Sequence, residues 1–226
     1  MYALKINQPQ RRVSADHVAK YRDIPTAVVG DCMARILAAP ATIRPMHAGG
    51  TVLAGPAYTV TTRPGDNLFV HRAIDLAQPG DVIVVDAGGA LDNAIMGEMM
   101  LTHAETRGLA GVVINGAIRD SGHVRNHPFP VFAAGITLRG PFQSGPGHVN
   151  VPIAVGVMAV QPGDLILGDD DGVICIPFEQ VEAIYPDAHK RLAGENAQRD
   201  RVRNGTVDRK WIEDKIASSP YTVEYT

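Results

Sequence analysis

Two apolar runs separated by a helical stretch constrain the fold of this chain more than any other feature. The runs are DVIVVD at residues 81–86 and LAGVVIN at residues 109–115. Such β-branched runs are typical of strands buried on both faces of a parallel sheet. Between them we expect a helix over residues 97–107, ended by Gly108. Strand, helix and strand in this order predict an α/β fold.

The rest of the chain continues this alternation. We expect an early helix over residues 24–37, a strand over residues 51–62, and a helix capped by Asp66 that ends before Pro79. The second half is rich in strand-like runs: PVFAAG, VPIAVGVMAV, DLILGD and GVICIP. From residue 178 to about residue 204 the pattern becomes charged and helical. These patterns predict one domain over residues 1–226, with a core at about 26–177 and a C-terminal helical extension over 178–226.

Composition excludes several classes of function. Of the 226 residues, 45% are hydrophobic and 20% are charged, and the net charge of −3 leaves no basic footprint for a nucleic acid. No apolar run approaches the roughly 20 residues of a membrane span, and the first residues lack the core of a signal peptide. Cys32 and Cys175 belong to no metal or disulfide spacing. We therefore expect a cytoplasmic protein with reduced thiols and neither a nucleic-acid nor a membrane partner.

One turn-strand unit occurs twice along the chain. QPGDVIVVDAGG at residues 78–89 resembles QPGDLILGDDDG at residues 161–172. Two similar structural units explain this repeat better than two equivalent active sites. Asp169, Asp170 and Asp171 could form a cation cage, but an acidic run before Gly between two strands is typical of a hairpin turn.

The stretch GLAGVVINGAIRDSG carries the first candidate site. An apolar strand there delivers Arg119 and Asp120 into the loop at its C-terminal end, which is where open α/β sheets bind ligands. Upstream, GEMM at residues 97–100 begins a helix, whose free N–H groups suit an anion. Amides, a guanidinium and a metal-binding carboxylate would together suit a small 2-oxo acid. The alternative is a surface turn whose two charges face water.

Several motifs occur together in order. The motifs are GDCMAR, PGDVIVVD, GEMM, RD and PGDLILGDDDGVICIP, which cover about residues 26–177, and twenty residues separate Glu98 from RD. In this order the chain resembles the metal-dependent 4-hydroxy-4-methyl-2-oxoglutarate aldolases. Their superfamily includes the 4-carboxy-4-hydroxy-2-oxoadipate aldolases and the RraA regulators of ribonuclease E. The resemblance implies a single-domain αββαβ-type sandwich, of swivelling-domain type, in homotrimers or hexamers with sites at subunit boundaries.

The resemblance also implies roles for individual residues. It places Mg²⁺ or Mn²⁺ on Asp120 and substrate binding on Arg119. It places further substrate binding on the turn that begins the helix: Gly97, Glu98, Met99 and Met100. A hard cation accepts a single protein carboxylate because it keeps waters and takes other ligands from substrate.

Glu98 departs from the aldolase pattern, which has Asp at this spacing, whereas the regulators have no acid there. Glu98 therefore favours an enzyme and is a candidate catalytic residue beside Arg119. A Glu in the first turn of a helix is also explained by the helix dipole alone.

Two functions follow from the resemblance. The first is a class II pyruvate aldolase that cleaves a 4-hydroxy-2-oxo acid to pyruvate and a second oxo acid, with oxaloacetate decarboxylase activity. Arg119 would then stabilise the developing enolate. The second is a regulator that binds ribonuclease E or another protein and performs no chemistry.

Other candidate residues have simpler interpretations. His123 and His127 are four residues apart, the spacing of a zinc pair on a helix, but Pro128 follows and a third ligand is missing. A pair in a loop is the better prediction. Glu195, in the C-terminal extension, could reach a neighbouring subunit's site, as an acid does in related aldolases. A solvated helix face explains it more simply.

Overall fold

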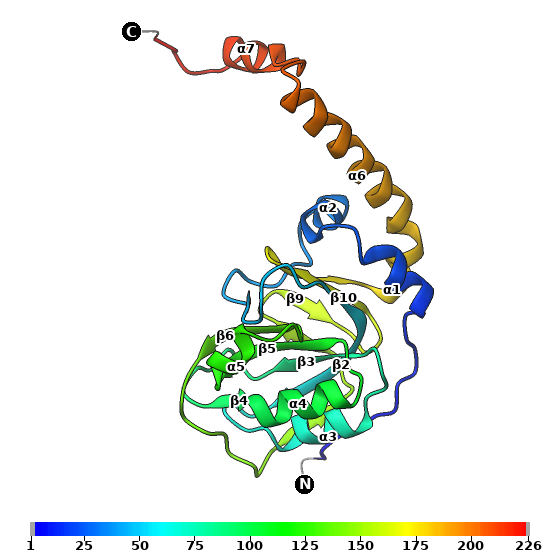
Figure 1. Ribbon diagram of the computed structural model, residues 1–226, viewed down its shortest axis with the longest axis vertical. Helices are drawn as coiled ribbons and strands as arrows, with labels where there is room; N and C mark the ends of the chain where they lie inside the picture. Colours follow the sequence, from blue (N-terminus) through cyan, green and yellow to red (C-terminus); the bar gives the residue numbers. More distant parts are fainter. Residues whose placement is uncertain (1–2, 225–226) are drawn as a thin grey trace. The chain divides into compact units, whose positions relative to one another are not determined.

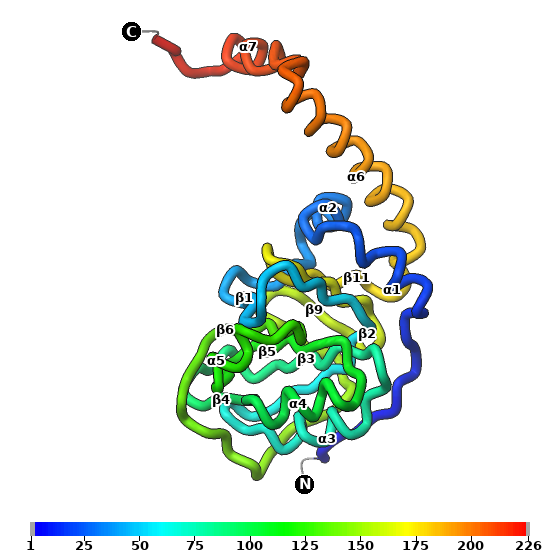
Figure 2. Tube along the Cα trace, viewed as in Figure 1, coloured from blue at the N-terminus to red at the C-terminus, as the bar shows by residue number. Residues whose placement is uncertain are grey.

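The structure is a computed structural model that describes residues 3–224, shown as a ribbon in Figure 1 and as a Cα trace in Figure 2. By internal contacts the chain divides into Met1–Ala188 and His189–Thr226. The helices are α1 (Ala15–Tyr21), α2 (Thr26–Cys32), α3 (Leu68–Leu76), α4 (Glu98–Thr106), α5 (Ser121–Arg125), the 3₁₀ helix η1 (Phe178–Gln180), α6 (Val181–Arg203) and α7 (Lys210–Ala217). The strands are β1 (Arg44–Pro45), β2 (Leu53–Thr62), β3 (Val82–Asp86), β4 (Ala94–Met96), β5 (Gly111–Ile118), β6 (Val131–Ile136), β7 (Gly147–Val149), β8 (Ile153–Val155), β9 (Met158–Val160), β10 (Leu165–Asp169) and β11 (Gly172–Ile176).

A mixed sheet forms the centre of the first unit. Within the described residues its strand order is β1-β6-β5-β3-β2-β10-β11, with β4 beside β5 and β7 beside β2. Strands β2, β3, β5 and β6 run parallel, whereas β10 and β11 are antiparallel additions. The predicted α/β fold is confirmed, since strand, helix and strand alternate through this sheet.

Both faces of the sheet are covered, as the apolar runs predicted. In β3, Ile83 and Val85 pack into one core with residues of α3 and α4, whereas Val82 and Val84 pack into a second core with the β8–β9 hairpin. All four side chains are buried. In Figure 1, α3 and α4 lie together on one side of the sheet. A strand inside such a sandwich has no face left for polar residues.

Pro-Gly-Asp turns precede three elements of the sheet unit. Gly65, Gly80 and Gly163 each have a positive φ, which Gly adopts without the steric cost of a Cβ atom. In the two repeated units, the carboxylates of Asp81 and Asp164 accept hydrogen bonds of 2.8 Å from the amides of Gln78 and Gln161. The repeat is therefore a repeated turn, as predicted. The third turn lies before α3 and involves Asp66.

Two local predictions were wrong: the length of the early helix and the loop position of the histidine pair. The early helix ends at Cys32 instead of residue 37, because Ala34 and Arg35 adopt left-handed conformations with φ of 54° and 63°. His123 and His127 are not a loop pair: His123 lies in α5 and His127 follows its end. Their rings stack, with centroids 5.2 Å apart. The five-residue α5 follows directly after Asp120 and lacks the apolar period that would have predicted it.

The acidic run that begins at the end of β10 forms the predicted hairpin turn. Strands β10 and β11 pair with Asp169 opposite Gly172. The carboxylate of Asp169 accepts hydrogen bonds from the amide and hydroxyl of Thr26, at 2.8 and 2.7 Å, and that of Asp170 accepts from the amide of Gly50 at 3.2 Å. The carboxylates of Asp169 and Asp170 thus accept hydrogen bonds from other parts of the chain, as in a structural turn.

The second unit, His189–Thr226, contains the end of α6 and the helix α7. Glu195 lies on α6 and forms an ion pair of 3.2 Å with Arg191, one turn earlier. Among residues 3–224, no helix combines the length and the apolar character needed to cross a bilayer.

Candidate functional site

Two strand ends bring the predicted site residues together. β4 and β5 run parallel, with Met96 opposite Ile118, so the residues that follow each strand emerge side by side. The amide of Arg119 donates to the carbonyl of Met96 at 2.9 Å. Gly97 and Glu98 at the start of α4 therefore lie next to Arg119 and Asp120. This juxtaposition was expected from the chain order alone.

Gly97 is required by this close approach. A Cβ atom at position 97 would overlap Oδ2 of Asp120 and would lie 2.8 Å from Cγ of Arg119. The backbone of Gly97 is extended, with φ −145°, so any residue could adopt it. Glycine is therefore needed here because a Cβ atom would not fit, and not because of the backbone conformation.

Asp120 joins the two strand ends through its carboxylate. Its Oδ2 accepts a hydrogen bond of 2.9 Å from the amide of Glu98. The residue itself is left-handed, with φ 57°, a conformation that Asp tolerates better than most residues. Among the described residues no hydrogen bond engages Oδ1, and the side chain is 40% exposed. One carboxylate oxygen thus remains open to a ligand from solution.

The start of α4 offers further donors. The first intrahelical bond runs from the Leu101 amide to the Gly97 carbonyl, so the amides of Met99 and Met100 precede the helical ladder. The two methionine side chains differ, because that of Met99 is 79% exposed whereas Met100 packs into the core. A role of Met100 in binding would therefore use its backbone.

A pocket of about 390 Å³ opens beside these groups. Arg119 lines it, and its guanidinium is 3.7 Å from the carboxylate of Asp120. The other lining residues come from α3, from β4 and the start of α4, and from the segment after β6: Asn67, His71, Ile95, Met96, Gly97, Met99, Met100, Gly140, Pro141 and Gln143.

Glu98, like Asp120, lies beside this pocket but not in its lining. Its Oε1 is 3.6 Å from Nδ1 of His123, and its side chain is 51% exposed. His123 stacks on His127, which in turn approaches Glu105 at 3.6 Å. The two stacked imidazoles thus lie between two carboxylates of α4. Within residues 3–224 no three side chains of His, Cys, Asp or Glu form a metal cage.

Three polar residues of the pocket were not singled out by sequence reasoning: Asn67, His71 and Gln143. Asn67 and His71 lie where α3 begins, and the amide group of Asn67 donates to the Ile95 carbonyl and the Met100 sulfur. Burial lowers the pKa of His71, which favours the neutral form of the imidazole. The only signal was the third Pro-Gly-Asp turn, which directly precedes Asn67.

Comparison with known proteins places the chain in a family. The model of the RraA-like family, described as Aldolase/RraA, matches residues 26–175. This chain belongs to the RraA-like family. The resemblance stated from the motifs is therefore confirmed.

Individual relatives agree with this RraA-like membership. A protein of Halalkalibacterium halodurans, named provisionally as a 4-hydroxy-4-methyl-2-oxoglutarate aldolase, is 39% identical over 90% of this chain and 97% of its own length. The 4-hydroxy-4-methyl-2-oxoglutarate aldolase of Thermus thermophilus is 36% identical over 50% of this chain and 68% of its own. Among solved structures, Streptomyces coelicolor RraAS2, described as an unusual member of the RNase ES inhibitor RraA family, has a TM-score of 0.75 and 26% identity. The match covers 84% of this chain and 100% of that one.

Proposed function

We propose that this RraA-like protein is a divalent-metal-dependent pyruvate aldolase. Its substrate would be a 4-hydroxy-2-oxo acid with two or three carboxylates, such as 4-hydroxy-4-methyl-2-oxoglutarate or 4-carboxy-4-hydroxy-2-oxoadipate. The observation that carries the proposal is the convergence of Arg119, Asp120 and the first amides of α4 beside one pocket. The names of two relatives support the same reaction.

The carboxylate of Asp120 fits a hard divalent cation. Its Oδ1 is open to a ligand, and no cage of three acidic or imidazole ligands exists among the described residues. A site with few protein ligands suits Mg²⁺ or Mn²⁺, which keep several waters, and does not suit a structural zinc ion. When bound, the cation would supply Lewis-acid stabilisation of negative charge on the substrate's oxygens.

The reaction breaks the C3–C4 bond of the substrate. The C4 hydroxyl loses its proton and becomes the carbonyl of the second oxo acid, while the bonding electrons form the enolate of pyruvate. Protonation at C3 then yields pyruvate. Decarboxylation of oxaloacetate would pass through the same enolate, with carbon dioxide as the second product.

Residues of the chain would act at both ends of this bond. Arg119 would hold the pyruvyl carboxylate and neutralise the enolate as it forms, and the amides of Met99 and Met100 would bind carboxylate oxygens. Glu98 would orient the water that takes the C4 hydroxyl proton. Its Oε1 lies 3.6 Å from Nδ1 of His123, and its side chain is half exposed, so it is accessible to such a water.

A second candidate function is the binding of ribonuclease E or another protein without chemistry. The observation in its favour is the similarity to RraAS2, which belongs to an inhibitor family. Glu98 argues against it, because the regulators have no acid at this position.

Release of pyruvate separates the two functions. Pyruvate is measured by coupling to lactate dehydrogenase, with oxaloacetate and several 4-hydroxy-2-oxo acids as substrates, in Mg²⁺ and in EDTA. The aldolase predicts turnover that EDTA abolishes and Mg²⁺ restores. Absence of turnover with every substrate would favour the binding protein.

A further inference from the structure

The segment Arg139–Gly145 forms one wall of the pocket through Gly140, Pro141 and Gln143. It belongs to no helix or strand, apart from an isolated bridge between Asp66 and Phe142. A wall of this kind is defined only if other parts of the protein hold it. Hydrogen bonds hold this segment along its whole length.

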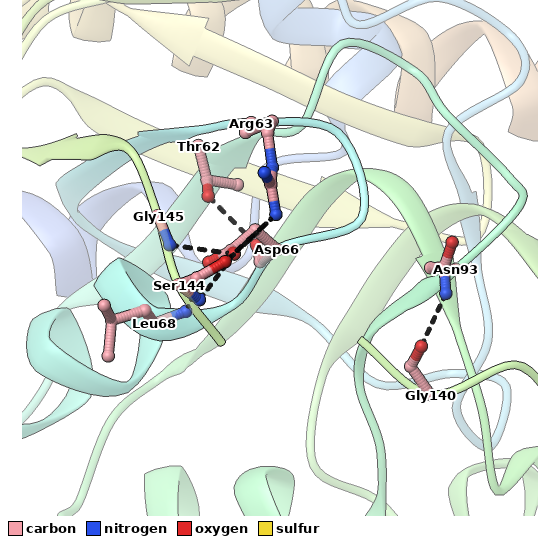
Figure 3. Close-up of polar contacts among 8 residues, drawn as sticks. All are labelled: Thr62, Arg63, Asp66, Leu68, Asn93, Gly140, Ser144 and Gly145. Atoms are coloured by element: carbon pink, nitrogen blue, oxygen red, sulfur yellow. Dashed lines mark hydrogen bonds and ion pairs between the residues drawn. The ribbon is translucent and has the colours of Figure 1, made fainter. Parts of the chain in front are cut away.

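Asp66 holds the end of this segment (Figure 3). Its carboxylate is completely buried and accepts hydrogen bonds of 2.8 Å from the amides of Ser144 and Gly145. It also accepts one of 3.0 Å from Leu68, at the start of α3, and forms an ion pair of 3.3 Å with Arg63. Burial alone would raise the pKa of Asp66, but these donors outweigh it and lower the pKa below its ordinary value.

The beginning and middle of the segment are held as well. The side-chain amide of Asn93 donates to the Gly140 carbonyl at 2.6 Å, as Figure 3 shows, and the Ala94 amide donates to Arg139 at 2.9 Å. Phe142 exchanges backbone hydrogen bonds with the turn before α3. A Cβ atom at Gly140 would lie only 3.2 Å from Nη1 of Arg119, so the segment directly abuts the guanidinium.

Gln143 is the part of this segment that is left for a ligand. It is exposed, it lines the pocket, and no hydrogen bond engages its side chain among the described residues. Its position follows from the contacts of Phe142 and Ser144, its two neighbours. Because its backbone is held in place and its side-chain amide is unbonded among the described residues, Gln143 can contact a substrate without a change in the shape of the pocket.

The charges of the pocket limit what it can bind. Arg119 is the one permanently charged side chain in the lining, and the other polar side chains are the amides of Asn67 and Gln143 and the imidazole of His71, whose neutral form is favoured by burial. In the proposed reaction Arg119 is committed to the pyruvyl end. Among the residues of this chain that line the pocket, the distal end of the substrate therefore meets uncharged groups, and each additional carboxylate would lose water without gaining a cation from them.

We propose that Gln143 determines how much negative charge the pocket accepts at the distal end of the substrate. The protein would then prefer dicarboxylic over tricarboxylic 4-hydroxy-2-oxo acids. Asp66 is the positioning residue that presents Gln143 to the pocket. The inference rests on the proposed function and names its substrate class.

The test compares kcat/KM for 4-hydroxy-4-methyl-2-oxoglutarate with that for 4-carboxy-4-hydroxy-2-oxoadipate, in Mg²⁺. The native protein should favour the dicarboxylic acid by about tenfold or more. Gln143→Lys places an ammonium group at the distal end and should shift this ratio about two- to fivefold towards the tricarboxylic acid, the effect of one partly exposed charge pair.

Two controls keep the result specific. Gln143→Met keeps the length of the side chain without hydrogen bonds or charge and should not shift the ratio towards the tricarboxylic acid. Gln180→Lys makes the same change of charge at an exposed position in η1, outside the pocket, and should leave the ratio unchanged. In an Asp66→Asn background, Gln143→Lys should shift the ratio of the two kcat/KM values by less than in the native background. The reason is that Asp66 no longer holds the segment Arg139–Gly145 in place.

A native preference for the tricarboxylic acid, or an unchanged ratio in Gln143→Lys, would overturn the inference while leaving the aldolase intact. Failure of the native protein to release pyruvate from either acid or from oxaloacetate would overturn the proposed function, and this inference with it. Turnover of oxaloacetate alone would overturn the substrate class.

Discussion

Replacement of Gly97 by Ala tests whether the arrangement of Arg119 and Asp120 matters for activity. The backbone at this position is extended, so Ala fits it without strain. The new methyl group would instead press on the two side chains that define the site. We expect the variant to fold normally and to lose most of its activity.

The size of the effect follows from the distances. The added Cβ would lie 2.8 Å from Cγ of Arg119, which must move by about 0.7 Å to reach an ordinary carbon–carbon contact of about 3.5 Å. The Asp120 carboxylate must move as well, and its bond to the Glu98 amide would lengthen. A misplacement of about 1 Å in a catalytic group costs about 10²-fold in rate. We therefore expect kcat/KM to fall by about 10²-fold.

The assay is steady-state pyruvate release by Gly97→Ala, Gly122→Ala and native protein, with thermal unfolding as a check of the fold. Gly122 is the matched control, because a Cβ atom there would meet nothing within 4 Å. Native turnover in Gly97→Ala would refute the reasoning. An equal loss in Gly122→Ala would show that the effect is not specific to the site.

Three further predictions test other parts of the account. Arg119→Lys keeps the charge but not the planar fork, so kcat should fall by about 10²–10³-fold, the scale of a lost oxyanion donor, with a smaller change in KM; an unchanged kcat with a raised KM would limit Arg119 to substrate binding. The folded-state pKa of Asp66 is lowered, so its ionised form stabilises the fold above its unfolded pKa of about 3.9, and this contribution is lost as the pH falls through the folded-state value. Denaturant unfolding between pH 2 and 7 should therefore show a shallower acid limb for Asp66→Asn than for native protein, together with a loss of about 3 kcal/mol at pH 7; identical acid limbs would contradict the contribution of Asp66. Light scattering should report a trimer or hexamer, as the family resemblance implies, and a monomer would count against sites at subunit boundaries.

The central strands of the sheet could be predicted because each is specified by the residues of its own short segment. Residues 82–85 of β3 and residues 111–114 of β5 are apolar and buried, and this pattern follows directly from burial on both faces. The juxtaposition of Glu98 with Asp120 also followed, because a connecting helix and strand bring a helix start next to a strand end. The roles of these residues in catalysis stay predictions.

The wall of the pocket could not be predicted, because it depends on contacts between distant parts of the chain. Asp66 was expected only as a helix cap, and its carboxylate does bond the Leu68 amide. Its bonds to Ser144 and Gly145 join residues 78 and 79 positions away, and no local pattern reports such a pairing. The left-handed Ala34 is similar, because neither its type nor its neighbours predict a helix end.

The most direct test of the central claim is the Mg²⁺ dependence of pyruvate release by Asp120→Asn beside native protein. Asn keeps the shape of Asp and its tolerance of the left-handed conformation at this position, so the fold should be unchanged. The account predicts that native turnover rises with Mg²⁺ to saturation, whereas the variant stays at least about 10²-fold slower at every concentration. A folded Asp120→Asn protein with native turnover and native Mg²⁺ dependence would contradict the account.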